Sequence, residues 1–224
     1  MTKYIRPGSH TPDRSAEAVG SYSSPACYLH EFDTGTTGMT SWEEIRDWRK
    51  QTRRLLIANR LAWSVNERRG RGDKAQQRLL DSCDLRQYTI LGIYWPMRGE
   101  IDIRNLACGH IDAGGMVGLP VVVEKSAPVE FWQWSPGMKM RPGVWNIPVP
   151  VERVVLTPDA LIVPLVGFDG SRYRLGYGGG YYDRTIAAAA KRPFCIGLGY
   201  AESGLNTIYP QPHDMPMDLI VTDD

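Results

Sequence analysis

Four glycines fall within five positions, residues 176–180, and this cluster constrains the chain more than any other feature. An apolar run at residues 160–168 precedes the cluster, and an alanine-rich run at residues 185–190 follows it. This order predicts a strand, a glycine loop and the start of a helix. Glycines allow a backbone to approach a ligand closely, and the free amides at a helix start favour anions.

The residues that flank the glycines fit an anion with a bound cation. Arg174 and Arg184 bracket the loop and offer donors suited to phosphate or carboxylate. Asp183 provides a carboxylate for a phosphate-bound divalent cation. The stretch lacks both the Gly-Lys-Ser/Thr of a P-loop and the last glycine of G-x-G-x-x-G, so it matches neither common nucleotide motif. Glycine richness alone would also fit a flexible surface turn.

Charge and cysteine usage exclude several classes of protein. The 224 residues suffice for one sizeable core, and 26 basic residues nearly balance 25 acidic ones. This balance argues against nucleic acid or a membrane surface as a partner. The scattered cysteines are typical of reduced thiols rather than of a disulfide framework or a zinc site. Without a signal-like start or an apolar run of membrane length, we expect a cytoplasmic protein. The cysteines are Cys27, Cys83, Cys108 and Cys195.

The chain divides into an extension and one domain. Residues 1–40 are rich in small polar residues and form an N-terminal extension of unknown role, whereas residues 41–224 form the domain. Ser41 and Glu44 fit a capping box, which begins a helix. Helices are predicted at residues 41–62, 74–86 and 101–113, a turn at 69–72, an extended loop at 140–150, and strands at 89–95, 119–123, 129–134, 160–168, 194–200 and 219–222.

Strands that alternate with helices predict an α/β fold. We expect a single three-layer domain in which a mostly parallel sheet carries helices on both faces. Ligands of such sheets bind beyond the carboxyl ends of the strands. Glu100, the glycine loop, Asp223 and Asp224 all follow predicted strands closely. The functional site is therefore expected at that edge.

Residues 168–183 closely resemble the signature of the 5-formyltetrahydrofolate cyclo-ligase family, also called methenyltetrahydrofolate synthetases. The resemblance extends over about residues 46–222 and includes family-like stretches at 96–102, 144–150 and 213–222. It implies a Rossmann-like version of the fold. The chain departs from the family in two places, since members do not generally carry the extension, and Tyr177 stands where some have arginine.

The resemblance implies an ATP site on the loop and the first helix. Lys50, Arg54 and Arg60 occupy the places of a family lysine and two arginines, and the first two would contact ATP phosphate. On spacing alone, a solvated basic face is the alternative. Lys50, Arg54 and Arg174 would be catalytic because they neutralise phosphate charge. The other implied ATP contacts are Leu175, Gly176, Tyr177, Gly178, Gly179, Gly180, Tyr181 and Tyr182.

The resemblance also implies a folate pocket and a magnesium site. Glu100 would hold the pterin and Trp145 would line the pocket, although an acid at a helix start and a packing tryptophan are the respective alternatives. Asp183 and Asp218 would hold Mg²⁺, with ATP as co-substrate. Further implied substrate contacts are Trp95, Tyr177 and Tyr181.

The implied reaction is the ATP-dependent cyclisation of 5-formyltetrahydrofolate to 5,10-methenyltetrahydrofolate, with release of ADP and phosphate. One alternative is a diverged paralogue that acts on another amide substrate, which would alter the pocket of Glu100 and Trp145. Another is a non-catalytic folate-binding or regulatory protein, which would not need an ATP–Mg²⁺ site. The residues expected for the folate pocket and those expected for the ATP–Mg²⁺ site are present in the sequence. We expect only small-molecule partners, and a monomer or weak homodimer.

Overall fold

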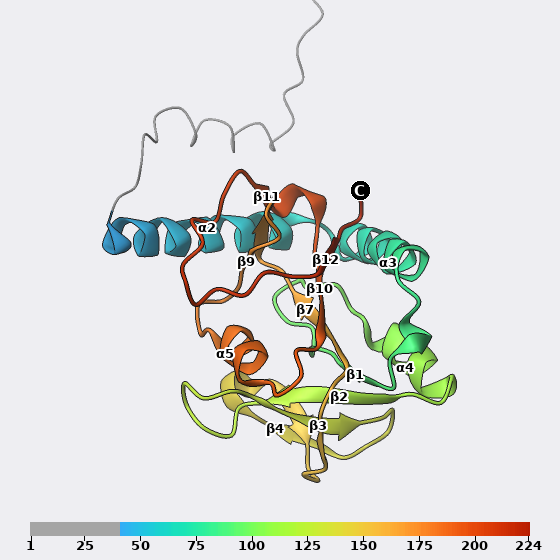
Figure 1. The fold of residues 1–224 in the computed structure, drawn as a ribbon. Helices are drawn as coiled ribbons and strands as arrows, with labels where there is room; N and C mark the ends of the chain where they lie inside the picture. Colours follow the sequence, from blue (N-terminus) through green and yellow to red (C-terminus); the bar gives the residue numbers. More distant parts are fainter. Residues whose placement is uncertain (1–40) are drawn as a thin grey trace, which may run out of the picture. The chain divides into compact units, whose positions relative to one another are not determined.

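A seven-stranded sheet forms the centre of the computed structural model, which describes residues 41–224 (Figure 1). The strand order is β12-β10-β7-β1-β2-β3-β6. The pairs from β12 to β2 are parallel, whereas β2–β3 and β3–β6 are antiparallel. The predicted α/β fold with a mostly parallel sheet is confirmed. The strands are β1 (Ile90–Gly92), β2 (Met116–Val121), β3 (Glu130–Trp134), β6 (Val155–Leu156), β7 (Ala160–Pro164), β10 (Phe194–Leu198) and β12 (Leu219–Val221).

Helices cover both faces of this sheet, α3 and α4 on one side and α5 on the other (Figure 1). Leu79 of α3 packs in one core cluster with Ile162 of β7. Ile186 of α5 packs in another with Leu161 and Val163 of the same strand. Because side chains alternate along a strand, consecutive residues of β7 fill two cores and produce three layers. The helices are α2 (Trp42–Ala62), α3 (Val65–Ser82), α4 (Arg104–Asp112) and α5 (Tyr181–Ala188).

α2 begins where the sequence predicts a helix. The Ser41 hydroxyl accepts from the Glu44 amide at 3.2 Å, and the Glu44 carboxylate accepts from the Ser41 amide at 3.2 Å. The predicted capping box is therefore confirmed. The inner face of α2 is unusual because two of its four buried side chains are arginines. The four are Ile45, Arg49, Leu56 and Arg60.

The turn predicted at residues 69–72 is wrong, because these residues lie inside α3. The helix predicted at residues 74–86 therefore starts earlier and ends at Ser82, before the short 3₁₀ turn η2 (Leu85–Gln87). Gly72 is buried, and a Cβ there would lie 3.3 Å from Cγ2 of Ile101. Close packing between α3 and the segment before α4 outweighs the cost of about 1 kcal/mol for a glycine in a helix.

The extended loop predicted at residues 140–150 is a hairpin. β4 (Met140–Pro142) pairs antiparallel with β5 (Pro148–Pro150), and the 3₁₀ turn η3 (Val144–Asn146) connects them. The amide of Gly143 donates to the Ile147 carbonyl at 2.8 Å and closes the turn. Prolines lack the amide that a ladder needs and weaken the sequence signal of a strand, yet an isolated hairpin tolerates them at its open edges.

The strand predicted at residues 160–168 is divided between two sheets. β7 ends at Pro164, and β8 (Gly167–Asp169) belongs to a separate three-stranded sheet. In that sheet β8 pairs with β9 (Arg174–Leu175) and β11 (Gly204–Leu205), and η4 (Ala201–Ser203) precedes β11. The glycine loop follows β9 directly, so the small sheet carries it.

The predictions for residues 1–40, which include the extension and Cys27, lie outside the described residues. Within residues 41–224, Cys83, Cys108 and Cys195 are free thiols. In this same part of the chain, every helix is too short or too polar to cross a bilayer.

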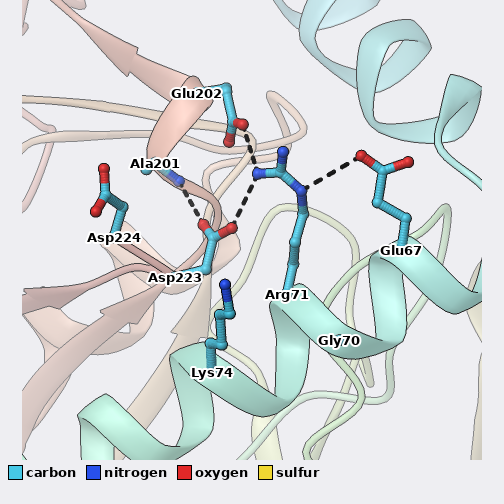
Figure 2. A pocket seen from close by; sticks show the side chains of 8 residues that line it. All are labelled: Glu67, Gly70, Arg71, Lys74, Ala201, Glu202, Asp223 and Asp224. Carbon is cyan, nitrogen blue, oxygen red and sulfur yellow. Dashed lines mark hydrogen bonds and ion pairs between the residues drawn. The ribbon is translucent and has the colours of Figure 1, made fainter.

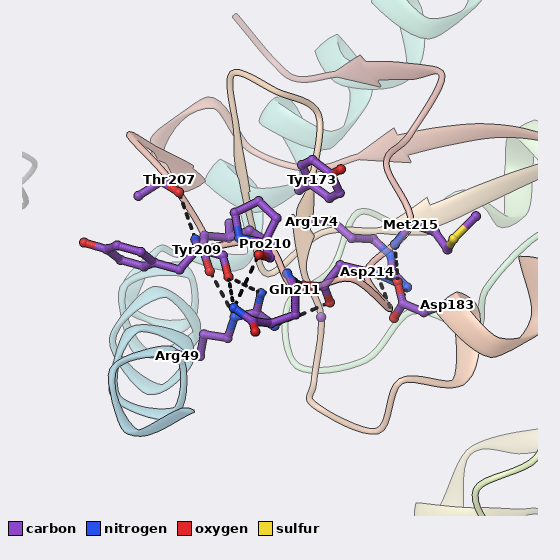
Figure 3. Close-up of polar contacts among 12 residues, drawn as sticks. Arg49, Tyr173, Arg174, Asp183, Thr207, Tyr209, Pro210, Gln211, Asp214 and Met215 are labelled. Atoms are coloured by element: carbon purple, nitrogen blue, oxygen red, sulfur yellow. Dashed lines mark hydrogen bonds and ion pairs between the residues drawn. The ribbon is translucent and has the colours of Figure 1, made fainter. Parts of the chain in front are cut away.

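A buried ion pair joins α2 to the C-terminal segment. Arg49 Nη2 lies 2.5 Å from Asp214 Oδ2 (Figure 3), and the two side chains are only 7% and 10% exposed. Arg49 also donates to the carbonyls of Ile208 and Tyr209, both at 2.9 Å. Asp214 accepts in addition from the Gln211 amide at 2.7 Å. The loop before β12 thus depends on α2 for its position.

We predict that Asp214→Ala lowers the free energy of unfolding by about 3 kcal/mol, because Arg49 stays buried without its counter-charge. Urea unfolding followed by circular dichroism measures the change. Asp47→Ala is the matched control, since Asp47 forms an exposed pair with Arg46 on the same helix. That variant should change the same free energy by less than about 1 kcal/mol. Equal losses of unfolding free energy in both variants would contradict a stabilising role for the buried Arg49–Asp214 pair.

Candidate functional site

The glycine loop, residues 176–180, connects β9 to α5 and exposes the start of that helix. Gly178 and Gly180 have left-handed backbone, with φ of 91° and 64°. Gly180 is the N-cap of α5, and it provides no side chain to cap the helix. The first amides of α5 therefore lack a side-chain acceptor at their N-cap. Such an end attracts anions.

Two arginines lie against the loop backbone. Arg53 of α2 donates from Nε to the Gly176 carbonyl at 2.7 Å, and Arg184 of α5 donates from Nη2 to the Gly179 carbonyl at 2.6 Å. A Cβ on Gly178 would lie 3.3 Å from Cζ of Arg53, so a glycine there makes room for the guanidinium group. Burial lowers the pKa of Arg53 most, and repulsion from nearby Arg49 lowers it further. A bound anion would relieve that repulsion.

The structure brings Arg53, and not Lys50 or Arg54, to the loop. Lys50 and Arg54 are exposed, and neither side chain makes a hydrogen bond or ion pair with another described residue. Their role in binding phosphate stays a prediction. Arg49 and Arg53 are also four residues apart, so spacing alone fits both pairs. In the structure, the pair Arg49 and Arg53 lies on the inner face of α2, where Arg49 is buried and Arg53 bonds to Gly176.

Arg174 faces Asp183 across the start of α5 (Figure 3). The closest nitrogen–oxygen distance is 3.1 Å, and the side chains are 5% and 11% exposed. Asp183 also accepts from the Met215 amide at 3.1 Å. This pair joins β9, α5 and the C-terminal segment, beside the glycine loop.

The two predicted magnesium ligands contact different groups. Asp218 accepts from Nη1 of Arg192 at 2.6 and 2.7 Å and from the Cys195 amide at 2.7 Å, whereas Asp183 pairs with Arg174. Within residues 41–224, no three His, Cys, Asp or Glu side chains are grouped for metal binding. Mg²⁺ commonly uses one or two carboxylates together with substrate phosphates, and Asp183 beside the loop fits that donor set. The pairing of Asp183 with Asp218 stays a prediction.

Glu100 lies in the segment after β1 and contacts the glycine loop. Tyr177 Oη donates to Glu100 Oε1 at 2.8 Å, and the Met97 amide donates to Oε2 at 2.8 Å. Arg60 Nη2 donates to Tyr177 Oη at 3.0 Å. Burial raises the pKa of Glu100 to about 7, although these donors and nearby cations lower it. Glu100 therefore titrates near neutral pH.

Trp145 reaches the loop from the tip of the β4–β5 hairpin. Its side chain is 64% exposed, and its ring is edge-on to Tyr181 with a centroid distance of 5.7 Å. A Cβ on Gly179 would lie 3.9 Å from the Trp145 ring. Trp145 and Asn146 both have positive φ, 57° and 60°. The hairpin thus presents an exposed aromatic face beside the glycines.

Three other predicted residues have mainly packing contacts. Trp95 packs edge-on to Trp134 at 6.3 Å between ring centroids. Leu175 is 1% exposed inside a core cluster, and its carbonyl accepts from the Val166 amide at 3.0 Å. Tyr182 packs under Arg174, and its buried hydroxyl has no hydrogen-bond partner among the described residues.

A cavity of about 680 Å³ lies between α3 and the ends of β10 and β12 (Figure 2). Arg71 at its centre pairs with Glu67, Glu202 and Asp223. The cavity contains predicted edge residues Asp223 and Asp224 but no residue of the glycine loop. Its charges are largely paired with one another, so the glycine loop remains the better candidate site.

Comparison with known proteins decides the family. The model of the 5-formyltetrahydrofolate cyclo-ligase family matches residues 45–223. The chain belongs to this family. A 5-formyltetrahydrofolate cyclo-ligase from Mycolicibacterium smegmatis is 27% identical over 186 residues, 78% of this chain and 93% of the relative. The corresponding enzyme from Haemophilus influenzae is 29% identical over 153 residues, 65% of this chain and 82% of the relative.

A solved structure supports the same family assignment. The NMR structure of Aquifex aeolicus 5,10-methenyltetrahydrofolate synthetase superposes with a TM-score of 0.68 at 26% identity. The match covers 78% of this chain and 89% of that one. The predicted family resemblance is confirmed, and this chain is an enzyme of the cyclo-ligase family, which uses ATP.

We predict that Arg53→Met lowers kcat/KM for ATP on the order of 10²-fold, since it removes a cation that lies on the glycine loop. Arg46→Met is the matched control, because Arg46 is an exposed arginine of the same helix with no proposed role, and it should lower kcat/KM by less than about 5-fold. Steady-state kinetics with varied ATP measure both. A larger loss in Arg54→Met than in Arg53→Met would instead support phosphate binding by the exposed face of Lys50 and Arg54.

Proposed function

We propose that this chain converts 5-formyltetrahydrofolate and ATP to 5,10-methenyltetrahydrofolate, ADP and phosphate. Family membership over residues 45–223 supports the reaction. The single observation that carries the proposal is the hydrogen bond of 2.8 Å between Tyr177 and Glu100. It joins a loop suited to phosphate with a carboxylate suited to the pterin, so two substrates can meet there.

The reaction requires activation of a poor electrophile. The formamide carbon resists attack because nitrogen donates electrons into its carbonyl group. Transfer of the γ-phosphoryl group breaks its bond to ADP and forms a bond to the formyl oxygen. N10 of the folate then attacks the formyl carbon and loses its proton, and the carbon–oxygen bond breaks to release phosphate. The protein must align two substrates and neutralise phosphate charge, which needs no covalent nucleophile.

On the phosphate side, Arg53, Arg184 and the loop amides are the proposed ligands. Arg53 and Arg184 already lie on the loop, with hydrogen bonds of 2.7 and 2.6 Å to its carbonyls. We also retain Lys50 and Arg54 as proposed ligands from the outer face of α2. Arg174 contributes positive charge from beneath the loop while it orients Asp183.

Magnesium would neutralise phosphate charge when bound with ATP, and we propose Asp183 as its principal protein ligand. Asp183 lies in the first turn of α5, directly after the glycine loop. Its carboxylate is now shared between Arg174 and the Met215 amide, so one oxygen would have to exchange partners. Asp218 is proposed as an outer partner, because Arg192 and the Cys195 amide already occupy its carboxylate.

On the folate side, Glu100 is proposed to accept hydrogen bonds from the pterin ring. Trp145 and Tyr181 offer aromatic faces beside the loop, and their edge-on contact leaves the exposed Trp145 ring free to stack. Tyr177 and Trp95 are proposed to border the same pocket. We also propose that the protein acts as a monomer or weak homodimer.

We predict that the protein, mixed with 5-formyltetrahydrofolate, ATP and Mg²⁺, produces an ATP-dependent rise at the methenyltetrahydrofolate absorbance band. Asp183→Asn should lower the rate by roughly 10²- to 10³-fold, because it removes the carboxylate charge in the first turn of α5, directly after the loop. Asp47→Asn, an exposed change on α2, is the control with unchanged rate. A flat trace from the unaltered protein that still binds folate would favour a different amide substrate or a regulatory role.

We predict that KM for 5-formyltetrahydrofolate rises as pH falls below about 7, because Glu100 protonates there and loses its charge as an acceptor. Each pH unit below that value should raise KM about 10-fold. Above pH 8 the carboxylate is ionised and KM should level off. Glu100→Gln should bind folate weakly at every pH and lose this dependence. A pH profile unchanged by that substitution would assign the titration to another group.

A further inference from the structure

Three side chains form a continuous hydrogen-bonded row between α2, the glycine loop and the segment after β1. Arg60 Nη2 donates to Tyr177 Oη at 3.0 Å, and Tyr177 Oη donates to Glu100 Oε1 at 2.8 Å. Glu100 Oε2 accepts from the Met97 amide at 2.8 Å. Both carboxylate oxygens of Glu100 are thereby oriented, one by its own backbone turn and the other by the glycine loop.

Chemistry sets the direction of every donor in this row. A guanidinium group can only donate, so the oxygen of Tyr177 must accept from Arg60. The single hydroxyl proton then points to Glu100, and a hydroxyl that accepts from a cation is itself a stronger donor. A row that begins at a cation and ends at a carboxylate has only one polarity.

Arg60 differs from Arg53 because its nitrogens are already used inside the protein. Arg60 is 5% exposed, its Nε donates to the Arg98 carbonyl at 3.0 Å, and its Nη1 donates to the Leu165 carbonyl at 3.2 Å. Nη2 makes the bond to Tyr177. Each guanidinium nitrogen therefore has a protein acceptor, which leaves Arg60 poorly suited to bind phosphate.

The groups that face Glu100 come from several elements around it. The bond from Tyr177 and the charges of Arg60 and Arg98 favour its ionised form, whereas burial opposes ionisation. No other carboxylate faces Glu100 among the described residues with which it interacts. The tyrosines that interact with its charge are Tyr94, Tyr177, Tyr182 and Tyr200.

We infer that Arg60 is a positioning residue for folate binding: it holds Tyr177 as a donor, and Tyr177 orients the Glu100 carboxylate toward the substrate. The inference rests on the proposed role of Glu100 in binding the folate. It gives Arg60 a function other than phosphate binding. It also makes Tyr177 the contact that couples the nucleotide loop to the folate pocket.

A double-variant cycle tests whether Arg60 acts through Tyr177. Arg60→Lys keeps the charge but replaces three nitrogens in a fixed plane with a single ammonium nitrogen, which cannot reach all three acceptors of Arg60. Tyr177→Phe removes one hydroxyl group. We expect each single variant to raise KM for 5-formyltetrahydrofolate about 10-fold, with a smaller rise in KM for ATP. The double variant should be no worse than the worse single variant, since both changes break the same row. Tyr88→Phe is the control, because Tyr88 stacks on Phe194 outside the row.

The titration of Glu100 gives a second readout that needs no turnover. Carbon-13 NMR of labelled glutamate, assigned with Glu100→Gln, follows its carboxyl group directly. The midpoint should rise by about one pH unit in Tyr177→Phe and in Arg60→Lys, because the carboxylate loses an oriented donor. It should stay constant in Tyr88→Phe. If Arg60→Lys fails to fold, Tyr177→Phe still tests the row.

Two outcomes would overturn the inference: losses that multiply in the double variant, or a Glu100 midpoint that does not move. An unchanged KM for 5-formyltetrahydrofolate in Arg60→Lys would also argue against a directed bond from Arg60 to Tyr177. A protein that forms no methenyltetrahydrofolate would instead overturn the proposed function. In that case the NMR titration still decides whether the row positions Glu100.

Discussion

The site depends on one face of α2, whose arginines bond to backbone carbonyls of distant segments. Arg49, Arg53 and Arg60 supply these donors. A guanidinium group has five N–H donors in a fixed plane, so one side chain can satisfy several carbonyls that no regular ladder reaches. Irregular segments at the carboxyl edge of the sheet are thus held by a helix. The carbonyls are those of Arg98, Leu165, Gly176, Ile208 and Tyr209.

Charges buried in this way need compensation. An unpaired buried charge is strongly destabilising, and the three arginines that are buried within residues 41–224, Arg49, Arg60 and Arg174, each have a carboxylate within reach. Asp214 contacts Arg49 and Asp183 contacts Arg174, whereas the third, Arg60, meets its carboxylate through a tyrosine hydroxyl. Two of these acids, Asp183 and Glu100, are also proposed substrate or metal ligands. Structural compensation and ligand binding therefore use the same side chains. A ligand that binds one of these acids must replace the interaction that the acid made with the arginine.

The sequence predicted the features whose signals are local. The structure contains three such features: the capping box of α2, the strand–loop–helix order around residues 176–180, and the alternation of helices with strands. Each depends on residues that are near neighbours in the sequence. The inner face of α2 was not predictable, because Arg53 is distinguished from Arg54 by a contact 123 positions later in the chain. The turn predicted at Gly72 failed for a similar reason, since its close packing against Ile101 is a tertiary contact.

The tip of the β4–β5 hairpin has a consequence for how this enzyme evolves. Two consecutive residues there, Trp145 and Asn146, adopt a left-handed backbone. This costs roughly 1–2 kcal/mol for the tryptophan, whereas asparagine adopts this conformation more easily. The folded protein already holds this conformation. A ligand that stacks on the Trp145 ring therefore orders the hairpin little further, and binding costs little conformational entropy. Selection for tighter binding at this tip then opposes selection for stability.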